Sequence, residues 1–201
     1  MSIAEQVTRL KTDFDEVKAD GIAEGRQAEY DAFWDVFQNY GNPTNYYFKF
    51  SYDSWTDENF NPKYPIVCNA TTTGGMSLFH NNKAITDTKV PIEVTGSTAG
   101  SMFYQMDNLV TVRKLKVHES VAFTSTFLYC KNLANITFDG VIGQSIDFAS
   151  SPLTAESVQS LIDHLKDLTG QTAKTVTFSS AVRGNLTDAQ ATEIWERNWS
   201  I

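Results

Sequence analysis

Cysteine and histidine are scarce in this chain of 201 residues, which contains 2 Cys and 3 His. Two thiols, Cys68 and Cys130, cannot build a disulfide framework. We expect both to be buried as small apolar side chains, with one bridge between them as the alternative. The three histidines lie in separate segments, and none of the common metalloprotease, redox or serine-hydrolase motifs occurs. The sequence therefore predicts no catalytic residue, no metal ligand and no cofactor.

Positive charge and long apolar runs are also missing. There are 16 Lys and Arg residues against 24 Asp and Glu residues, a formal charge of −8. Without a basic surplus the chain cannot release counterions from phosphates, which argues against a nucleic-acid partner. No run approaches the roughly 18 apolar residues of a membrane span, and residues 1–18 lack the apolar core of a secretory signal. We expect a protein made in the cytoplasm that contacts no membrane.

Residues 1–18 carry a narrow apolar stripe with spacings of 4, 3, 4 and 3 residues. Such a heptad stripe buries too little surface to stabilise a helix by itself, so the helix must pack on something. Either it docks on its own domain or it forms a short parallel coiled coil between copies of the chain. We assign residues 1–41 as an oligomerisation or anchor region, with the following oligomerisation residues: Ile3, Val7, Leu10, Phe14 and Val17.

A second helix is predicted over 26–42, where aromatic residues from Tyr30 to Tyr40 recur at helical spacing and Gly41 and Pro43 follow. An aromatic stripe of this kind is typical of a packed core rather than of a ligand platform. Residues 44–54 alternate as one strand or a packed extended segment, and residues 56–65 read as a loop. We expect residues 44–77 to be the least regular part of the chain.

An internal repeat occupies the middle of the chain, where the segment from Phe103 to Val112 matches the segment from Phe127 to Ile136 at an offset of 24 residues. A fixed period near 24 indicates a solenoid; the alternative is chance similarity between two apolar segments. We expect strands near 110–117 and 136–138, each Phe stacked on the next, and no readable repeat over 86–100. The predicted repeat core is Phe79, Phe103, Met106, Leu109, Phe127, Cys130, Leu133 and Ile136.

The chain changes character near residue 151. Residues 154–170 read as a helix that Thr154 caps and Gly170 ends, with His164 on its polar side. Residues 172–179 alternate as a strand, and a capping box at 187–190 opens a last helix. A repeat array needs a terminal unit over its last core layer, and this helix–strand–helix unit, about 151–201, suits that role. We place Trp195 and Trp199 in this cap.

The pattern F-x-x-C-x-N-L-x-x-I at 127–136 resembles the BspA-type leucine-rich repeat, and 103–112 carries an altered form with Met106 in the Cys position. The N-terminal segments, the segment from Trp55 to Tyr64 and the C-terminal block together resemble leucine-rich-repeat proteins encoded near tail genes in phages and prophages of Gram-positive gut bacteria. The resemblance implies an α+β fold: an N-terminal helix, then over 42–201 a short irregular solenoid with parallel strands and a C-terminal cap.

The resemblance implies a non-catalytic structural or binding module of a phage particle. Its partners would be copies of itself in a homo-oligomer such as a trimer, other virion proteins, or a bacterial surface receptor or glycan. One alternative is a tail-associated glycan hydrolase, whose acid and base would come from scattered carboxylates: Asp87, Glu93, Asp107 and Glu119. The other is an intracellular prophage protein that binds a host protein.

Overall fold

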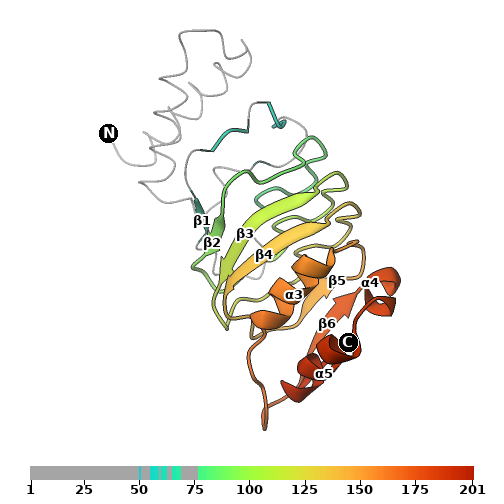
Figure 1. The fold of residues 1–201 in the computed structure, drawn as a ribbon. Helices are drawn as coiled ribbons and strands as arrows, with labels where there is room; N and C mark the ends of the chain where they lie inside the picture. Colours follow the sequence, from blue (N-terminus) through green and yellow to red (C-terminus); the bar gives the residue numbers. More distant parts are fainter. Residues whose placement is uncertain (1–49, 51–54, 59, 63–64, 69–76) are drawn as a thin grey trace.

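The computed structural model describes residues 50, 55–58, 60–62, 65–68 and 77–201. Two predictions, the heptad stripe from Ile3 to Val17 and the aromatic helix over 26–42, lie outside the described residues, as does the whole region 1–41. The described part mixes helices with two sheets of parallel strands (Figure 1). The expectation of an α+β fold with parallel strands is confirmed at this level.

The larger sheet contains four parallel strands in chain order: β1 (Ile66–Cys68), β2 (Ile92–Val94), β3 (Thr111–Val117) and β4 (Asn135–Gly140). Figure 1 shows them side by side along one flank of the molecule, with the connecting loops on the opposite flank. The strands expected at 110–117 and 136–138 are therefore present. Strand β2 falls within 86–100, where no repeat was readable, and it pairs with β3 in the same parallel sense.

One face of this sheet supplies the core because apolar residues alternate along each strand. Rows of buried side chains run across the strands at the same level. Ile66 is opposite Ile92, which is opposite Leu115, which is opposite Phe138, and all four side chains are buried. The alternation therefore fixes which face of each strand packs inward.

The backbone repeats with the same period over the opposite flank. Six of the eight non-glycine residues with positive φ among the described residues form two series, and the members of each series are one repeat period apart. Such left-handed residues are uncommon outside tight turns. Their recurrence shows that 77–81, 101–105 and 125–129 share one backbone course. The first series is Ser77, Ser101 and Ser125; the second is Asn81, Gln105 and Tyr129.

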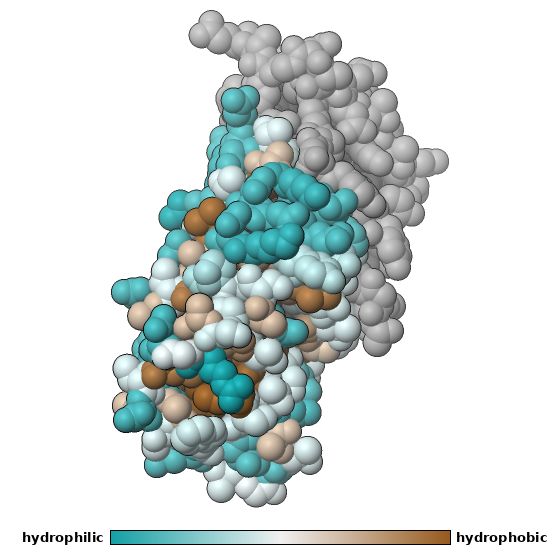
Figure 2. All heavy atoms as spheres, turned by 90° about the vertical axis from the view of Figure 1, so that its right-hand side faces the viewer, coloured by the Kyte–Doolittle hydropathy of each residue, from teal (hydrophilic) through white to brown (hydrophobic). Residues whose placement is uncertain are grey.

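The surface of this loop flank faces the viewer in Figure 2. Hydrophilic side chains cover much of its upper described part, and apolar side chains gather mainly in its lower part, at the height of the C-terminal elements in Figure 1. The flank is therefore polar over the repeated turns and more apolar toward the C-terminal unit.

A column of phenylalanine rings fills the core behind these turns. Phe79 stacks on Phe103 at a centroid distance of 5.4 Å, and Phe103 stacks on Phe127 at 5.5 Å. The expected contact between successive Phe rings is thus present. The column also extends by one ring at each end, with Phe50 stacked on Phe79 at 5.1 Å and Phe148 on Phe127 at 4.5 Å. The 24-residue period of the sequence does not predict these two end rings.

We call residues 77–81, 99–105 and 123–129 the first, second and third Phe stretch. Backbone hydrogen bonds join each of the first two stretches to the next one. Phe79 N donates to Met102 O over 2.8 Å, Ser101 N to Thr124 O over 2.9 Å, and Gln105 N to Leu128 O over 2.9 Å. Ala99 and Phe103 donate in the same way to the third stretch and its flank. Alternate N–H groups of one stretch therefore bind carbonyls of the next.

The C-terminal part contains a second sheet, in which β6 (Lys174–Phe178) lies between β5 (Ile146–Phe148) and β7 (Trp199–Ser200). Its helices are α3 (Ala155–Asp163), α4 (Ser180–Gly184) and α5 (Asp188–Glu196). The expected strand over 172–179, the Thr154 cap and the Thr187–Gln190 capping box are confirmed. The unit has more strands than the helix–strand–helix cap that the sequence suggested.

The helix predicted over 154–170 is too long, because α3 ends at Asp163. Beyond it the chain becomes extended: Ile142 N donates to His164 O over 2.8 Å, and Lys166 N donates to Ile142 O over 2.9 Å. Arg197 binds the exposed helix end by donating to Ile162 O and Leu165 O. Leu165 and Leu168 are still buried, so their helical spacing was misleading.

The two tryptophans assigned to the cap have different environments. Trp199 is buried and its indole N–H donates to Lys166 O over 2.8 Å. Trp195 is 60% exposed on α5, while the neighbouring Ile194 is buried. Both tryptophans therefore lie in the C-terminal unit, Trp195 on its surface and Trp199 in its core.

Helix α3 occupies the place beside β4 that a fifth strand would take (Figure 1). Ser157 Oγ accepts from Ile136 N over 2.9 Å and donates to Ala134 O over 3.0 Å, and Ser160 Oγ accepts from Phe138 N over 2.9 Å. Two serine hydroxyls thus accept hydrogen bonds from N–H groups at the outer edge of β4, which would otherwise be unpaired.

Candidate binding surface on the outer face of the parallel sheet

The outer face of the four-stranded sheet is the candidate functional surface, because it carries charged side chains on a regular scaffold. Strand β3 contributes most of the positive charge. Its register shifts between Val112 and Leu115, which marks a bulge, and both Arg113 and Lys114 are exposed there. Bulges re-aim side chains in this way.

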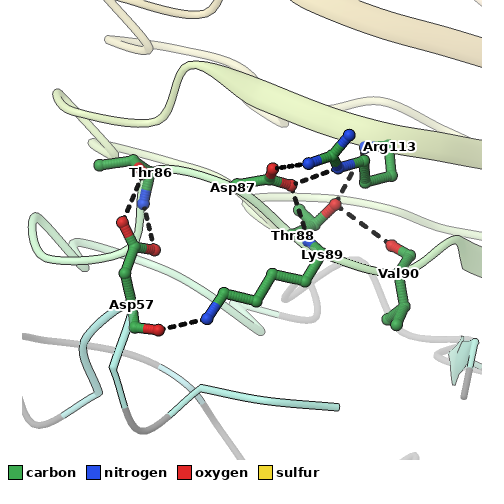
Figure 3. A network of polar contacts seen from close by, with 7 residues as sticks. All are labelled: Asp57, Thr86, Asp87, Thr88, Lys89, Val90 and Arg113. Atoms are coloured by element: carbon green, nitrogen blue, oxygen red, sulfur yellow. Dashed lines mark hydrogen bonds and ion pairs between the residues drawn. The ribbon is translucent and has the colours of Figure 1, made fainter. Parts of the chain in front are cut away.

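Arg113 makes a two-pronged ion pair with Asp87 (Figure 3). The Nε–Oδ1 distance is 3.0 Å and the NH2–Oδ2 distance is 2.5 Å. Arg113 N also donates to Thr88 Oγ1 over 3.0 Å, and Lys89 N donates to Asp87 Oδ1 over 2.7 Å. Hydrogen bonds therefore hold Arg113 at both its backbone N–H and its guanidinium, which fixes the orientation of the guanidinium. Two parallel bonds of this kind make Arg–carboxylate pairs geometrically specific.

Asp57 extends this network toward the N-terminal side (Figure 3). Its carboxylate accepts from Thr86 N over 2.9 Å and from the Thr86 hydroxyl, and its backbone carbonyl accepts from Lys89 Nζ. These bonds span 29 to 32 residues of sequence. They fix the segment 86–89 against residues that lie far away in the chain.

A second row of charges crosses the sheet one level further along the strands. Lys116 lies between Glu93 and Asp139 in the strand register, and Lys116 Nζ is 2.8 Å from Glu93 Oε1. The hydrogen bond and charge of Glu93 raise the pKa of Lys116. Val67 continues the row on β1 as an exposed apolar side chain.

Asparagines and hydroxyls brace the turns beneath this face. Asn108 Nδ2 donates to Lys83 O and Asn132 Nδ2 donates to Asp107 O, each over 2.8 Å and across 25 residues. Thr137 Oγ1 donates to Arg113 O over 2.6 Å. Each of these side chains donates a hydrogen bond to a carbonyl of the preceding repeat. Hydrogen bonds between neighbouring repeats therefore fix the backbone that carries the charged face.

The predicted repeat-core residues are all buried and contribute no group to this face. The sequence pattern also missed a member: Asn82 precedes Met106 by one repeat period, and its buried amide donates to Phe50 O and Trp55 O. The two cysteines are free and buried, so the disulfide alternative is wrong. Burial raises the pKa of the Cys130 thiol to about 12.

The four carboxylates considered for a hydrolase each have a separate cation. Asp87 binds Arg113, Glu93 binds Lys116, and Glu119 binds Lys166 at 2.7 Å. Asp107 lies 3.2 Å from Lys131 Nζ and 3.6 Å from Lys83 Nζ. The hydrogen bond and charge of Lys166 lower the pKa of Glu119. This is the opposite of the raised pKa that a general acid needs.

Two of the histidines bind backbone carbonyls. His118 Nε2 is 2.9 Å from Gly96 O, and its Nδ1 is 2.9 Å from Ser120 Oγ. His164 caps α3, with Nδ1 2.7 Å from Ser160 O, and it is half-buried rather than on an exposed polar face. Within the described ranges, no three His, Cys, Asp or Glu side chains gather where they could hold a metal ion.

No family model, no curated protein and no solved structure matches this chain. In the part of the chain that the structure describes, none of the helices has the length and apolar character that a membrane crossing requires. The residues themselves therefore carry the functional argument.

Proposed function

We propose that this chain is a non-catalytic binding module of a phage or prophage particle, built as a short leucine-rich-repeat-like solenoid. The observation that carries the proposal is the periodic recurrence of the backbone, seen in the left-handed series from Ser77 to Ser125 and in the Phe column. Repetition of one unit produces a rigid, extended surface, which is how repeat proteins recognise partners.

The outer face of the sheet is the proposed recognition surface. Charged groups at the edge of an interface give orientation and association rate more than affinity. The Asp87–Arg113 pair and the Glu93–Lys116 pair hold their members in place before a partner arrives, which lowers the entropy lost on binding. Lys114 has no ion-pair partner within the described residues, so it is the cation most available to an anionic group on the partner.

The state of the carboxylates supports a binding role over a hydrolase. A glycosidase needs two carboxyl groups that face one bond, one of them with a raised pKa. Here each of the four candidate carboxylates is bound to its own lysine or arginine. We therefore retain the binding module as the proposal.

The N-terminal region 1–41 is proposed to join copies of the chain through Ile3, Val7, Leu10, Phe14 and Val17. Several weak sites on one oligomer gain avidity without new contacts. Light scattering on the full chain and on a variant lacking residues 1–20 tests this part. We expect an oligomer, such as a trimer, that becomes a monomer on deletion; a monomeric full chain would contradict it.

The virion role is tested by labelling purified phage particles with an antibody against the chain and imaging them by negative stain. Labelled tails or fibres are the expected result. Binding to intact host cells is then compared with capture from host lysate. If particles stay unlabelled and only a lysate protein binds, the intracellular prophage role replaces the virion role.

A pair of charge-reversal variants locates the surface. Lys114→Glu should weaken binding of the chain to intact host cells at least tenfold, because it reverses the available cation on the outer face. Arg183→Glu reverses another exposed cation, on α4 and away from the sheet, and should leave binding unchanged. Equal effects of the two variants would show that net charge matters and the sheet face does not.

A further inference from the structure

The amide donors of the third Phe stretch are unused. In the second stretch the N–H groups of Ala99, Ser101, Phe103 and Gln105 all donate to carbonyls of the next turn. The equivalent donors, one repeat period later, belong to Phe123, Ser125, Phe127 and Tyr129. Across the described residues, none of these four N–H groups has an acceptor. Phe123 and Phe127 are buried, Ser125 is half-buried and Tyr129 is exposed. Buried backbone donors are nearly always paired, so the free donors of the first three residues require an explanation.

Among the described residues, no backbone hydrogen bond joins the next turn, residues 143–148, to these donors. Strand β5 pairs with β6, with Ile146 opposite Val176 and Phe148 opposite Phe178. The chain comes close to the third turn just before this point: a Cβ on Gly143 would lie 2.3 Å from Glu119 O. The two segments then separate, although the stacking of Phe148 on Phe127 continues.

A groove of about 400 Å³ opens where they separate. Residues 122–125 form one wall and residues 144–147 form the other, and Thr175 and Thr177 of β6 complete the lining. Phe123 and Ser125, which carry two of the free donors, are among the lining residues. The volume is within the range of about 300–1,000 Å³ that is usual for ligand sites.

The preceding turn shows which chemistry fits these donors. Ala99 N and Ser101 N, the equivalents of Phe123 N and Ser125 N, bind the carbonyl oxygens of Ala122 and Thr124, each over 2.9 Å. These acceptors are alternate carbonyls of a segment that runs parallel to the stretch and forms the bridge between Thr98 and Ala122; beyond Phe123 that segment turns, with Ser125 left-handed. A short length of extended peptide chain that supplies two such carbonyls fits this position, because Ala122 O and Thr124 O bind the second stretch in that way.

We propose that the groove between 122–125 and 144–147 binds an extended peptide segment of a partner protein, whose alternate carbonyls accept from Phe123 N and Ser125 N. Addition of an extended segment to an open edge is an established mode of peptide recognition. The hydroxyls around the groove add polar contacts for the side chains of the segment; they belong to Thr124, Ser145, Thr175 and Thr177. This site lies on residues other than the outer sheet face, so it stands independently of the proposed function.

The free donors are tested first by amide hydrogen exchange on the full chain. The amides of Phe123 and Ser125 should exchange at least tenfold faster than those of Ala99 and Ser101, their equivalents one turn earlier. Equal protection would mean that the third stretch is bonded like the second, and the proposal would be wrong.

Binding is tested with a displayed library of random seven-residue peptides and, in parallel, a glycan array. The enriched peptide is synthesised and titrated while backbone amide resonances are followed. Thr177→Trp places a large ring in the groove from the exposed side of β6 and should weaken binding at least tenfold. Thr192→Trp makes the same change on an exposed position of α5, outside the groove and the outer sheet face, and should have little effect.

The outcomes separate clearly. An enriched peptide that shifts the amides of Phe123 and Ser125 and is lost with Thr177→Trp alone supports the proposal. No enrichment, or binding that Thr177→Trp leaves intact, overturns it. Glycan binding that Thr177→Trp abolishes would also overturn it, since the groove would then take a sugar. None of these results depends on the outer sheet face, which Lys114→Glu tests separately.

Discussion

The third Phe stretch has two different sides. Toward the second stretch it combines ring stacking, Phe103 on Phe127, with a row of amide hydrogen bonds from 99–105 to 122–128. Toward the C-terminal part the ring stacking of Phe127 on Phe148 continues, at the shorter distance of 4.5 Å, and within the described ranges no backbone hydrogen bond of the stretch accompanies it. The comparison shows that the apolar column and the amide row are separable: the column can continue after the backbone pairing has stopped.

The two sides differ in whether the neighbouring turn places its backbone groups within hydrogen-bond distance of the third stretch. The second and third stretches have the same length and backbone course, so donors and acceptors align along the whole stretch. After the third stretch the chain passes so close to the preceding turn that a Cβ on Gly140 or Gly143 would overlap the carbonyl oxygen of Val117 or Glu119. Its strand β5 then pairs with β6. Helix α3 replaces the missing strand beside β4 through Ser157 and Ser160.

The largest expected effect comes from removing a ring of the Phe column on the side where the amide hydrogen bonds are also present. Phe103→Ala should lower the free energy of unfolding by about 3–5 kcal/mol, because a fully buried ring that stacks on two neighbours leaves a cavity. Urea denaturation measures the change. Trp195→Ala, which removes an exposed aromatic ring, is the matched control and should cost little. Similar losses in both variants would mean that the column does not carry the core.

The second largest effect should come from the close approach of Gly140 to the backbone of Val117. Gly140 has a φ of 88°, and a Cβ there would lie 1.9 Å from Val117 O. Gly140→Ala should therefore cost about 2 kcal/mol or more of unfolding free energy, from both strain and displacement of the turn. At Gly184, no atom of the described residues outside its own helix lies within 4 Å of an added Cβ, so Gly184→Ala should be neutral or slightly stabilising in the same thermal melt. Equal melting temperatures for the two variants would show that the close approach at Gly140 does not constrain the turn.

Removal of the hydroxyl that replaces the missing strand should have a smaller effect. Ser157→Ala leaves Ile136 N without its acceptor at a buried position, which should cost about 1–3 kcal/mol. Ser157→Thr keeps the hydroxyl and should recover part of that loss. If chemical denaturation shows the alanine and threonine variants to be equally unstable, the volume at position 157 matters and the hydrogen bond does not.

The smallest effect concerns the ion pair between Glu119 and Lys166, which joins two segments near the groove. Lys166 lowers the pKa of Glu119, so the stabilisation is present above the ordinary carboxyl pKa and is lost as the pH falls through the lowered value. An NMR titration of the Glu119 side chain should show its pKa rise in Lys166→Met. An unchanged titration would show that the pair does not persist in solution.

Much of the regular part could be predicted from the sequence. The match between Phe103 and Phe127 predicted the strands near 110–117 and 136–138 and the stacked rings. The pattern failed where a position keeps its place but changes its chemistry. Asn82 occupies the place of Met106 and Cys130, and the amide that replaces an apolar side chain there is satisfied by the carbonyls of two residues near the start of the described part.

The ends of the column were missed because their spacing differs. Phe148 follows Phe127 by less than one repeat period and Phe50 precedes Phe79 by more than one, so a search at a fixed period does not find them. The consequence is that the length of the column had to come from the tertiary structure.

The end of α3 was missed for another reason. Leu165 and Leu168 fit helical spacing and are buried, but Leu165 is buried from an extended segment that pairs with Ile142. Periodicity reports burial without reporting the backbone that achieves it.

The scarcity of cysteine and histidine, the period of the Phe residues, the buried strand faces and the helix starts at Thr154 and Thr187 were determined by the sequence alone. These features depend on residue type and local spacing. Only the tertiary structure decided that Arg113 meets Asp87, that each candidate carboxylate has its own cation, and that the amide donors of the third Phe stretch stay free. Such pairings depend on how segments far apart in the sequence are placed against each other, and no local pattern encodes that placement.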